Sequence, residues 1–513
     1  MMRVWHCFRS RAARVAVFLL LFCLCLESPV AFALAEASPA VDSSRSLEAE
    51  MDELVRMMNL NLRYILHDWW NAERDYAYAS STNSDKADTS LTEEQRRAVE
   101  KSTRTFADWR NTEELYVPFL NREQAENGIR PVAHAIYCIS LALYYDYYDE
   151  EITGVSRADA EAMCIRLLSA VTGEHRANHT DSPDDGCWGD SWQSPLWAEN
   201  IGLGAWLLRD RMDPAIYARA ERMVLDEANT LMYDYEIPYY MDKDGTILFP
   251  GDTKGEEIAW DAKLLALACF MFPESEERPG WNSKLERMLV SATAMPEDVS
   301  SERLVDGKKV SEMISGSNVN DDGTVVNHDL YHIDYMATIL EEMGDTIILY
   351  IIAGEPVPEA AVFNLDKIYR ALIYVDLGRY DESRAGQNFY TRNETGRPTG
   401  DIGMPGKNDW GKAGYAIYYL CDVMADTLGL DADIEESCKA RVWEKIHYEK
   451  MREQIYREAE NKSVGQFFLP GENSFVSVEP FMMHNLVEAY LLKSQCFESF
   501  FATISVSEDE SMR

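Results

Sequence analysis

Apolar residues recur at three- and four-residue spacing through most of the chain, which is the pattern of helices with one apolar face. Few segments show the strict alternation that predicts a half-buried strand. Several connections are short, as in RDRMD (209–213) and AGEPVPE (353–359), so helices joined in this way should run antiparallel. The pattern predicts helices at about 47–75, 92–110, 128–149, 157–172, 194–210, 213–233, 257–272, 281–293, 333–354, 357–375, 412–429, 432–460 and 479–497.

These helices predict a dominantly all-α protein. Their arrangement as hairpins, without a fixed-period repeat, favours an (α/α) toroid or incomplete barrel, in which an inner ring of helices is wrapped by an outer one. Residues 36–513 would form this toroid as a single large domain. The segment YYMDKDGTILF (239–249) has a D-G turn between extended residues and predicts a minor β-hairpin.

The first 35 residues have the layout of a cleavable export signal. A basic start precedes an apolar run from Val15 to Leu26, and small residues alternate in AFALA, which ends at residue 35. The apolar run is shorter than the ~18 residues that a membrane-spanning helix needs. We therefore expect a secreted or periplasmic protein that leaves the membrane once residues 1–35 are cleaved. An uncleaved anchor is the alternative.

Composition narrows the classes of partner. The formal net charge is -39, so we expect no binding to nucleic acid. The same charge disfavours general attraction to any acidic polymer. The cysteines after residue 35 are scattered and include no C-x-x-C pair, which argues against a zinc knuckle or a dense disulfide framework.

The longest non-helical stretch, residues 378–412, is the one region that would favour an anionic ligand. It carries six basic residues against five acidic ones in an otherwise acidic chain. Loops of this length in a compact domain are usually functional or disordered, and the aromatic and glycine residues here argue against disorder. A structural loop with solvated charges is the alternative.

Two histidines and two tyrosines lie within eight positions of the stretch NVNDDGTVVNHDLYHIDYM (318–336). The turn and short β-branched segment before them predict a helix that begins near His328. In that helix His328 and His332 form an i,i+4 pair, so the two imidazoles share one face. Tyr331 and Tyr335 form a second pair beside them. Imidazole and phenol together can serve as a base and an acid; a polar cluster that satisfies buried hydrogen bonds is the alternative.

The letters HDLYH also match the spacing of the H-E-x-x-H zinc helix, with Asp329 in place of the glutamate. The shorter aspartate side chain reaches less far toward a metal-bound water, and no clear third ligand follows. We therefore predict no metal site and no cofactor.

The segment DDGTVVNHDLYHIDYM (321–336) resembles a motif of the helical-toroid polysaccharide lyases. This group contains chondroitin and hyaluronan lyases, heparinase II/III-like enzymes and oligoalginate lyases. The motif reads D-G-S-x-x-x-H or D-G-x-x-x-E-G-x-x-Y, and Asp322 and Gly323 match its opening. His328 falls where the chondroitin lyases carry their catalytic histidine. Tyr331 falls where the alginate and heparinase types carry their tyrosine.

A second segment, DSWQSPLWAENIGLGAWLL (190–208), resembles the N-W-W-x-x-E-I-G helix of the chondroitin lyases through Trp192, Glu199, Ile201 and Gly202. Two departures stand out. The asparagine that opens the motif in that family is absent at Asp190, and the two motifs are further apart here than in the chondroitin type.

The resemblance implies β-elimination at a uronic acid in a polysaccharide substrate. His328, beside His332, would be the base, and Tyr331 or Tyr335 the acid or a shared acid and base. The other implied roles are divided among several residues. The neutraliser of the sugar carboxylate would be Asn200, Asn318 or Asn320 together with Arg379 or Arg384. Sugar rings would stack on Trp192, Trp197 or Trp410, with Glu199 as a further substrate-binding residue; packing of the tryptophans in the core is the alternative.

Two other functions remain open at this stage. A glycoside hydrolase on the same toroid would use a pair of carboxylates, for which Glu199, Glu256, Glu257, Asp321 and Asp322 are candidates. A non-catalytic glycan-binding protein would keep the tryptophans and need neither histidine nor tyrosine. Nothing in the sequence specifies an oligomeric state.

Overall fold

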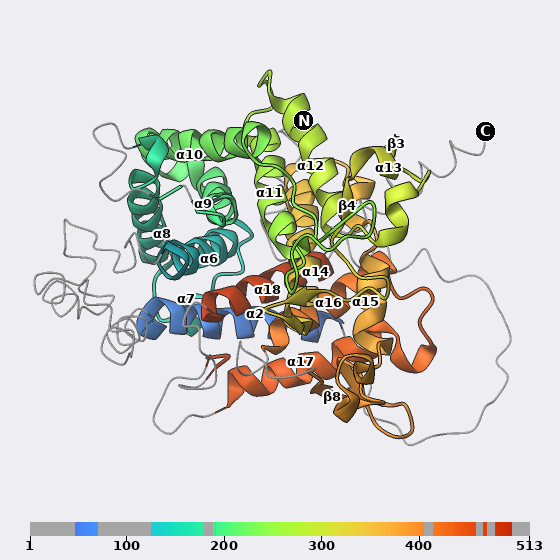
Figure 1. Ribbon diagram of the computed structural model, residues 1–513. Coiled ribbons are helices and arrows are strands. Elements are labelled where there is room, and N and C mark those ends of the chain that lie inside the picture. Colours follow the sequence, from blue (N-terminus) through green and yellow to red (C-terminus); the bar gives the residue numbers. More distant parts are fainter. Residues whose placement is uncertain are drawn as a thin grey trace, which may run out of the picture. The chain divides into compact units, whose positions relative to one another are not determined.

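Helices dominate the computed structural model, in the places where the spacing of apolar residues predicts them (Figure 1). The structure describes residues 47–69, 125–178, 188–189, 191–404, 414–457, 465–468 and 478–494. The α-helices are α2 (Leu47–Tyr64), α6 (Ala125–Tyr144), α7 (Glu150–Thr153), α8 (Arg157–Gly173), α9 (Ser194–Leu208), α10 (Pro214–Tyr233), α11 (Gly255–Met271), α12 (Arg278–Ala292), α13 (Val310–Met313), α14 (Ile333–Ala353), α15 (Leu365–Tyr374), α16 (Tyr415–Leu428), α17 (Ala440–Tyr456) and α18 (Val478–Lys493). The prediction of a dominantly all-α protein is confirmed.

Two of the predicted helices differ from the observed ones for identifiable reasons. The helix predicted at 357–375 is divided into a 3-10 turn, Glu359–Val362, and α15, because Asn364 between them adopts a left-handed φ of 57°. The helix predicted at 432–460 begins only at Ala440, whose N–H donates to the Asp431 carboxylate at 2.9 Å. The predicted helix at 92–110 and the predicted export signal at 1–35 lie outside the described residues.

Strands within the described residues are short and pair only as two-stranded antiparallel ribbons. The segment 239–249 does turn back on itself as predicted, with an antiparallel bridge between Met241 and Ile247 and a hydrogen bond from Leu248 N–H to the Tyr240 carbonyl. Its strand pairs in addition with a distant one, which the sequence did not predict. The pairs are β1 (Met241–Asp242) with β4 (Gly316–Ser317), β2 (Leu304–Val305) with β3 (Lys308–Lys309), β5 (Val326–Asn327) with β6 (Leu330–Tyr331), and β7 (Tyr390–Arg392) with β8 (Pro398–Ile402).

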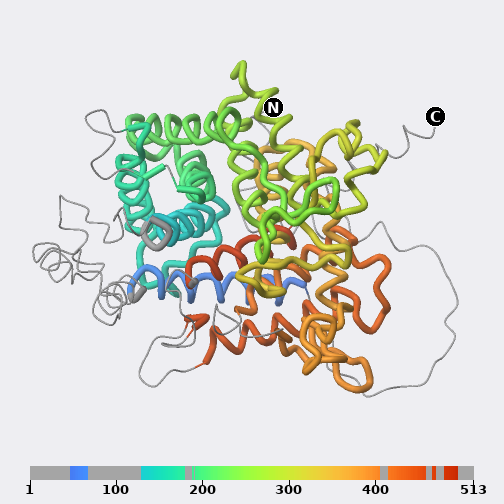
Figure 2. Tube along the Cα trace, viewed as in Figure 1, coloured from blue at the N-terminus to red at the C-terminus, as the bar shows by residue number. Residues whose placement is uncertain are grey.

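Six helices contact one another in chain order: α6 with α9, α9 with α11, α11 with α14, α14 with α16, and α16 with α18. The last of them, α18, also contacts α6, although the two are far apart in the sequence (Figure 2). Five further long helices each pack against one of the six: α8 on α6, α10 on α9, α12 on α11, α15 on α14 and α17 on α16. The apolar core lies between these layers and includes the fully buried Trp197, Trp281 and Trp443.

Four of the six helices, α9, α11, α14 and α16, run in the same direction. Successive contacts between neighbours advance along both helices, as parallel packing requires. The segments that precede these four helices therefore lie at one common end. The contacts are Glu199–Lys263 and Gly202–Leu267 for α9 and α11, Gly255–Ile339 and Lys263–Asp345 for α11 and α14, and Asp334–Tyr418 and Ala337–Cys421 for α14 and α16.

Candidate functional site

The segments before α11, α14 and α16 meet at the common end of the parallel helices. Asp329, before α14, donates its N–H to the carbonyl of Gly251, before α11, at 3.0 Å. Arg379, before α16, forms an ion pair with Asp322, before α14, at 2.7 Å. The polar and aromatic side chains of these segments therefore form one neighbourhood, which is the candidate functional site.

The predicted helix start at His328 is wrong, because residues 326–331 form a β-hairpin instead. Asn327 pairs with Leu330, which leaves His328 and Asp329 as a two-residue turn with φ values of 52° and 61°. Two consecutive positive φ angles are those of a type I′ turn, which suits the twist of a hairpin. His328 is exposed on this turn, and α14 begins five residues later at Ile333. His328 and His332 are therefore not an i,i+4 pair on a helix.

The hairpin is held by the segment before α11. Thr253 donates both its N–H and its hydroxyl to the carbonyl of Val326, at 2.6 and 2.8 Å. Asn327 donates to Glu256 at 2.6 Å, and burial raises the pKa of this carboxyl group well above its ordinary value. Gly251 has a φ of 79°, and a Cβ atom there would lie 2.0 Å from the exposed Asp329 carboxylate, so a larger residue would strain the backbone and displace that side chain.

The hairpin brings three of the predicted catalytic side chains together. The Tyr335 hydroxyl lies 3.4 Å from Nε2 of His328, and the two ring centroids are 5.5 Å apart. The His332 ring packs edge-on against Tyr335, with centroids 4.8 Å apart, and is buried, whereas Tyr335 is half-buried. An exposed imidazole thus faces a phenol across a short gap.

Tyr331 belongs to a second network at the same end. Its ring stacks on that of Tyr380, with centroids 3.3 Å apart, and the Tyr380 hydroxyl donates to Asp322. Asp322 also accepts from Arg379, and the Thr324 hydroxyl donates to it at 2.7 Å. Burial raises the pKa of Tyr331 and Tyr380, so both phenols keep their protons. Tyr380 could not be predicted from the sequence, because its stacking partner is 49 residues away.

Three asparagines were predicted to neutralise a sugar carboxylate, and each has a structural partner. Asn318 accepts from the N–H of Tyr240 at 2.8 Å and donates to two backbone carbonyls. Asn200 is fully buried and donates to the Leu196 carbonyl at 3.3 Å. Asn320 donates to Thr324 at 3.1 Å, which places it in the network of Asp322 and Arg379. Only Asn320 therefore lies beside the candidate site.

The predicted basic and aromatic ligand-binding residues are divided between surface and core. Arg384 ends the 3-10 turn Glu382–Arg384, and its Nε lies 3.6 Å from Oδ2 of Asp381. Trp192 is 55% exposed and lies 5.3 Å from Trp260 of α11, measured between ring centroids, whereas Trp197 is fully buried and cannot stack on a sugar. Trp410 lies outside the described residues.

Glu199 is also buried, and it belongs to a charged cluster between the helices that the sequence analysis missed. The Nζ atom of Lys263, on α11, is in direct contact with the Asp345 carboxylate. It also lies 2.8 Å from a carboxylate oxygen of Glu342 and 3.6 Å from one of Glu199. Burial opposes the charge on Lys263, but the neighbouring carboxylates, Asp345 first, raise its pKa well above the ordinary value. Burial raises the pKa of Glu199 to about 8. No side chain of this cluster is exposed enough to meet a polymer.

No helix in the described part of the chain is both long and apolar enough to cross a membrane. Comparison of the sequence with family models and with curated proteins, and of the structure with solved structures, found no match.

Proposed function

We propose that the chain is an exported carbohydrate-active enzyme that cleaves a uronic-acid polysaccharide by β-elimination. The observation that carries the proposal is the exposed His328 imidazole facing the Tyr335 phenol at 3.4 Å, beside a loop that contains an arginine. Elimination needs a base for the proton on C5, an acid for the oxygen that leaves C4, and a group that stabilises the charge on the sugar carboxylate.

The helical architecture supports this reading. We infer that the six helices in mutual contact form the inner ring of an (α/α) toroid and that α8, α10, α12, α15 and α17 belong to its outer layer. In such a ring, the segments before the parallel inner helices gather at one mouth. Helix N-termini carry partial positive charge, so this mouth would favour carboxylate groups despite the acidic composition of the chain.

In the proposed reaction, Nε2 of His328 takes the C5 proton, and the electron pair of that bond forms the C4–C5 double bond. The C4–oxygen bond breaks, and the Tyr335 phenol gives its proton to the leaving oxygen. The proton then returns from His328 to Tyr335 across their contact, which resets both groups for the next turnover.

Arg379 is the best candidate for the carboxylate-stabilising group. Its side chain is 52% exposed and pairs with Asp321 and Asp322. Asp321 is exposed, so a substrate carboxylate can replace it on the guanidinium while Asp322 keeps the side chain oriented. Asn320 reaches the same network through Thr324 and would support this position.

A glycoside hydrolase is the second candidate, and Glu256 is the observation that favours it. Its pKa is raised by burial, as a general acid requires, and its partner Asn327 adjoins the exposed turn. Glu256 is only 2% exposed, so a sugar reaches its carboxyl group less easily than it reaches the exposed His328 imidazole.

One experiment separates these functions. The purified full chain is incubated with alginate-, chondroitin-, hyaluronan- and heparin-type polymers and with neutral glycans, and both ultraviolet absorbance and reducing ends are followed. Elimination produces new reducing ends together with the absorbance of an unsaturated uronate. Reducing ends without that absorbance would indicate a hydrolase, and binding with neither product would indicate a glycan-binding protein; either result would reject the proposed elimination.

A further inference from the structure

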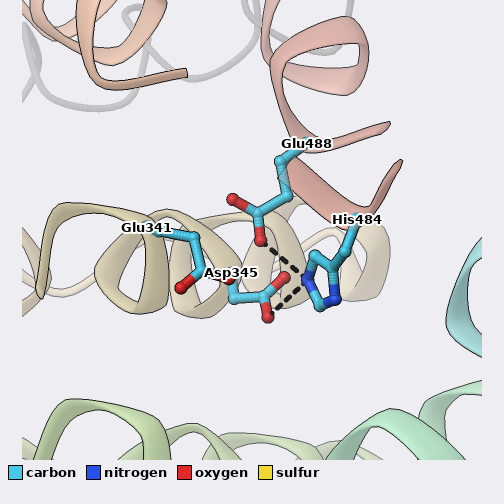
Figure 3. Close-up of side chains that lie close together, drawn as sticks. All are labelled: Glu341, Asp345, His484 and Glu488. Carbon is cyan, nitrogen blue, oxygen red and sulfur yellow. Dashed lines mark hydrogen bonds and ion pairs between the residues drawn. The ribbon is translucent and has the colours of Figure 1, made fainter. Parts of the chain in front are cut away.

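Four side chains from two neighbouring helices converge inside the helical layer, away from the candidate site. Glu341 and Asp345 lie one turn apart on α14, and His484 and Glu488 lie one turn apart on α18 (Figure 3). One nitrogen or oxygen atom from each lies within 4.8 Å of the corresponding atoms of the other three. All four residues are buried, with exposures of 0 or 1%.

The contacts within this group leave specific oxygen atoms with only other carboxyl groups as neighbours. Nε2 of His484 lies 2.9 Å from both the Asp345 and the Glu488 carboxylates. Apart from the neighbouring carboxyl groups, Glu342 for Glu341 and Asp345 for Glu488, neither oxygen of Glu341 nor Oε2 of Glu488 has a hydrogen-bond partner in the described part of the chain. The neighbour that Glu341 approaches is another carboxylate, Glu342, which repels it when both are ionised. Buried carboxylate oxygens left in this state are costly.

The surrounding charges do not balance the carboxylates. With Glu342 included, four acidic side chains lie around one lysine, Lys263, which contacts Asp345 and Glu342 directly. A fifth, Glu199, keeps its proton at neutral pH because burial raises its pKa to about 8. Among the described residues, Glu341 and Glu488 form no direct ion pair with Lys263, although its charge acts on both. A second cation or bound protons must compensate them.

We propose that Glu341, Asp345, His484 and Glu488 bind one divalent transition-metal ion. Three carboxylates with one imidazole are a ligand set that suits Mn²⁺, Fe²⁺ or Zn²⁺ rather than a soft ion such as Cu⁺. The four ligand atoms lie within 4.8 Å of one another, so bonds of about 2.0–2.2 Å require the side chains to move closer together around the ion.

The imidazole already has the second contact that a metal ligand needs. Nδ1 of His484 lies 2.8 Å from Nδ1 of His134 on α6, and the two rings meet edge-on. A metal on Nε2 fixes the proton of His484 on Nδ1, which then donates to His134. Such an outer hydrogen bond orients the ring and increases its basicity as a ligand. The ion would thereby connect α14 and α18 and, through His134, α6.

The test uses the full chain, and its readouts do not depend on enzymatic activity. Because the four side chains are buried, the protein is unfolded, stripped with a chelator, and refolded with or without Mn²⁺ or Zn²⁺; Mg²⁺ and Ca²⁺ serve as comparisons. We expect one Mn²⁺ or Zn²⁺ per chain by elemental analysis after desalting, and a melting temperature that rises with the concentration of the ion.

The variants Glu341→Gln and Glu488→Gln remove one ligand charge each and should weaken ion binding by about 10–100-fold. The control is Asp422→Asn, which changes a buried carboxylate that bonds a histidine, His447, at 2.7 Å but has no place in the four-residue group. It should lower stability and keep ion binding unchanged.

A second readout is independent of any variant. The paramagnetic resonance of Mn²⁺ bound to the wild-type chain should show coupling to one imidazole nitrogen. Absence of bound ion from both purified and refolded wild-type protein would overturn the proposal and leave the carboxylates holding protons only. Ion binding that both glutamine variants retain at full affinity would overturn it as well.

Discussion

The exposed turn of the hairpin at 326–331 and the buried cluster around Lys263 both hold ionisable side chains, but in opposite surroundings. In the hairpin, His328 lies on a turn that faces solvent, and its contact with Tyr335 is open to a ligand. In the cluster, Lys263 and Asp345 are buried and form an ion pair with each other. Exposure, more than residue type, decides which group can act on a substrate and which must balance its charge within the fold.

The largest effect should follow from removing the buried cation. Lys263→Met leaves Glu199, Glu342 and Asp345 without their ammonium partner, which should cost about 3–5 kcal/mol of unfolding free energy in urea denaturation. The control is Lys493→Met, because Lys493 also pairs with two carboxylates but is partly exposed. Equal losses for the two variants would mean that the buried cluster has no special energetic role.

The next effect concerns the support of the hairpin. Gly251→Ala places a Cβ atom 2.0 Å from Asp329 and should lower both the stability, by about 1–3 kcal/mol, and the elimination rate. Gly245→Ala is the matched control, because that glycine also has a positive φ, 83°, but has no atom within 4 Å of the added Cβ. If both variants lose the same stability, the positive φ of the two glycines explains the loss and the contact of Gly251 with the hairpin does not.

The pH dependence of the unfolding free energy should distinguish the buried cluster from the exposed turn, because only the cluster holds a carboxyl group with a strongly raised pKa. Burial raises the pKa of Glu199 from 4.5 to about 8, so the folded chain holds a proton there that the unfolded chain releases. That contribution to stability is complete below pH 4.5 and disappears as the pH rises through about 8. Wild type should lose up to about 1.4 kcal/mol per pH unit between about pH 5 and 8 relative to Glu199→Gln. A constant difference between the two chains would contradict the buried, protonated state.

The smallest effect is expected at the aromatic surface. Trp192→Ala should weaken polysaccharide binding by about 0.5–1.5 kcal/mol, seen as a higher KM with kcat nearly unchanged, if its exposed ring stacks on a sugar. Tyr144→Ala removes another exposed aromatic ring, at the C-terminal end of α6, and should leave KM unchanged. Identical KM values for both variants would exclude Trp192 from the substrate path.

The helices could be predicted because their signal is local. The apolar spacing predicts a helix at 333–354, and α14 spans Ile333–Ala353. The hairpin just before it was missed because an exposed His-Asp turn lacks the glycine that usually marks positive φ, although the β-branched residues before it and the alternation around it fit a strand pair.

The buried cluster could not be predicted because its members come from distant helices. Glu341 and Asp345 occur in a strongly apolar helix, and only the packing of α11 and α18 against α14 brings Lys263 and His484 to them. The sequence did identify His328 and Tyr335 as neighbours, but for the wrong geometric reason. Their contact arises from a hairpin turn followed by a helix start, and not from one helical face.

The role of His328 as the base is tested most directly by the elimination rate of the variant His328→Asn on the polymer that the wild-type chain cleaves. Asparagine tolerates the left-handed backbone at this position, so the hairpin should persist while the base is lost. We predict a rate at least about 10²-fold lower, with an unchanged urea midpoint. A variant that still forms the unsaturated product at the wild-type rate would contradict the assignment of His328 as the base.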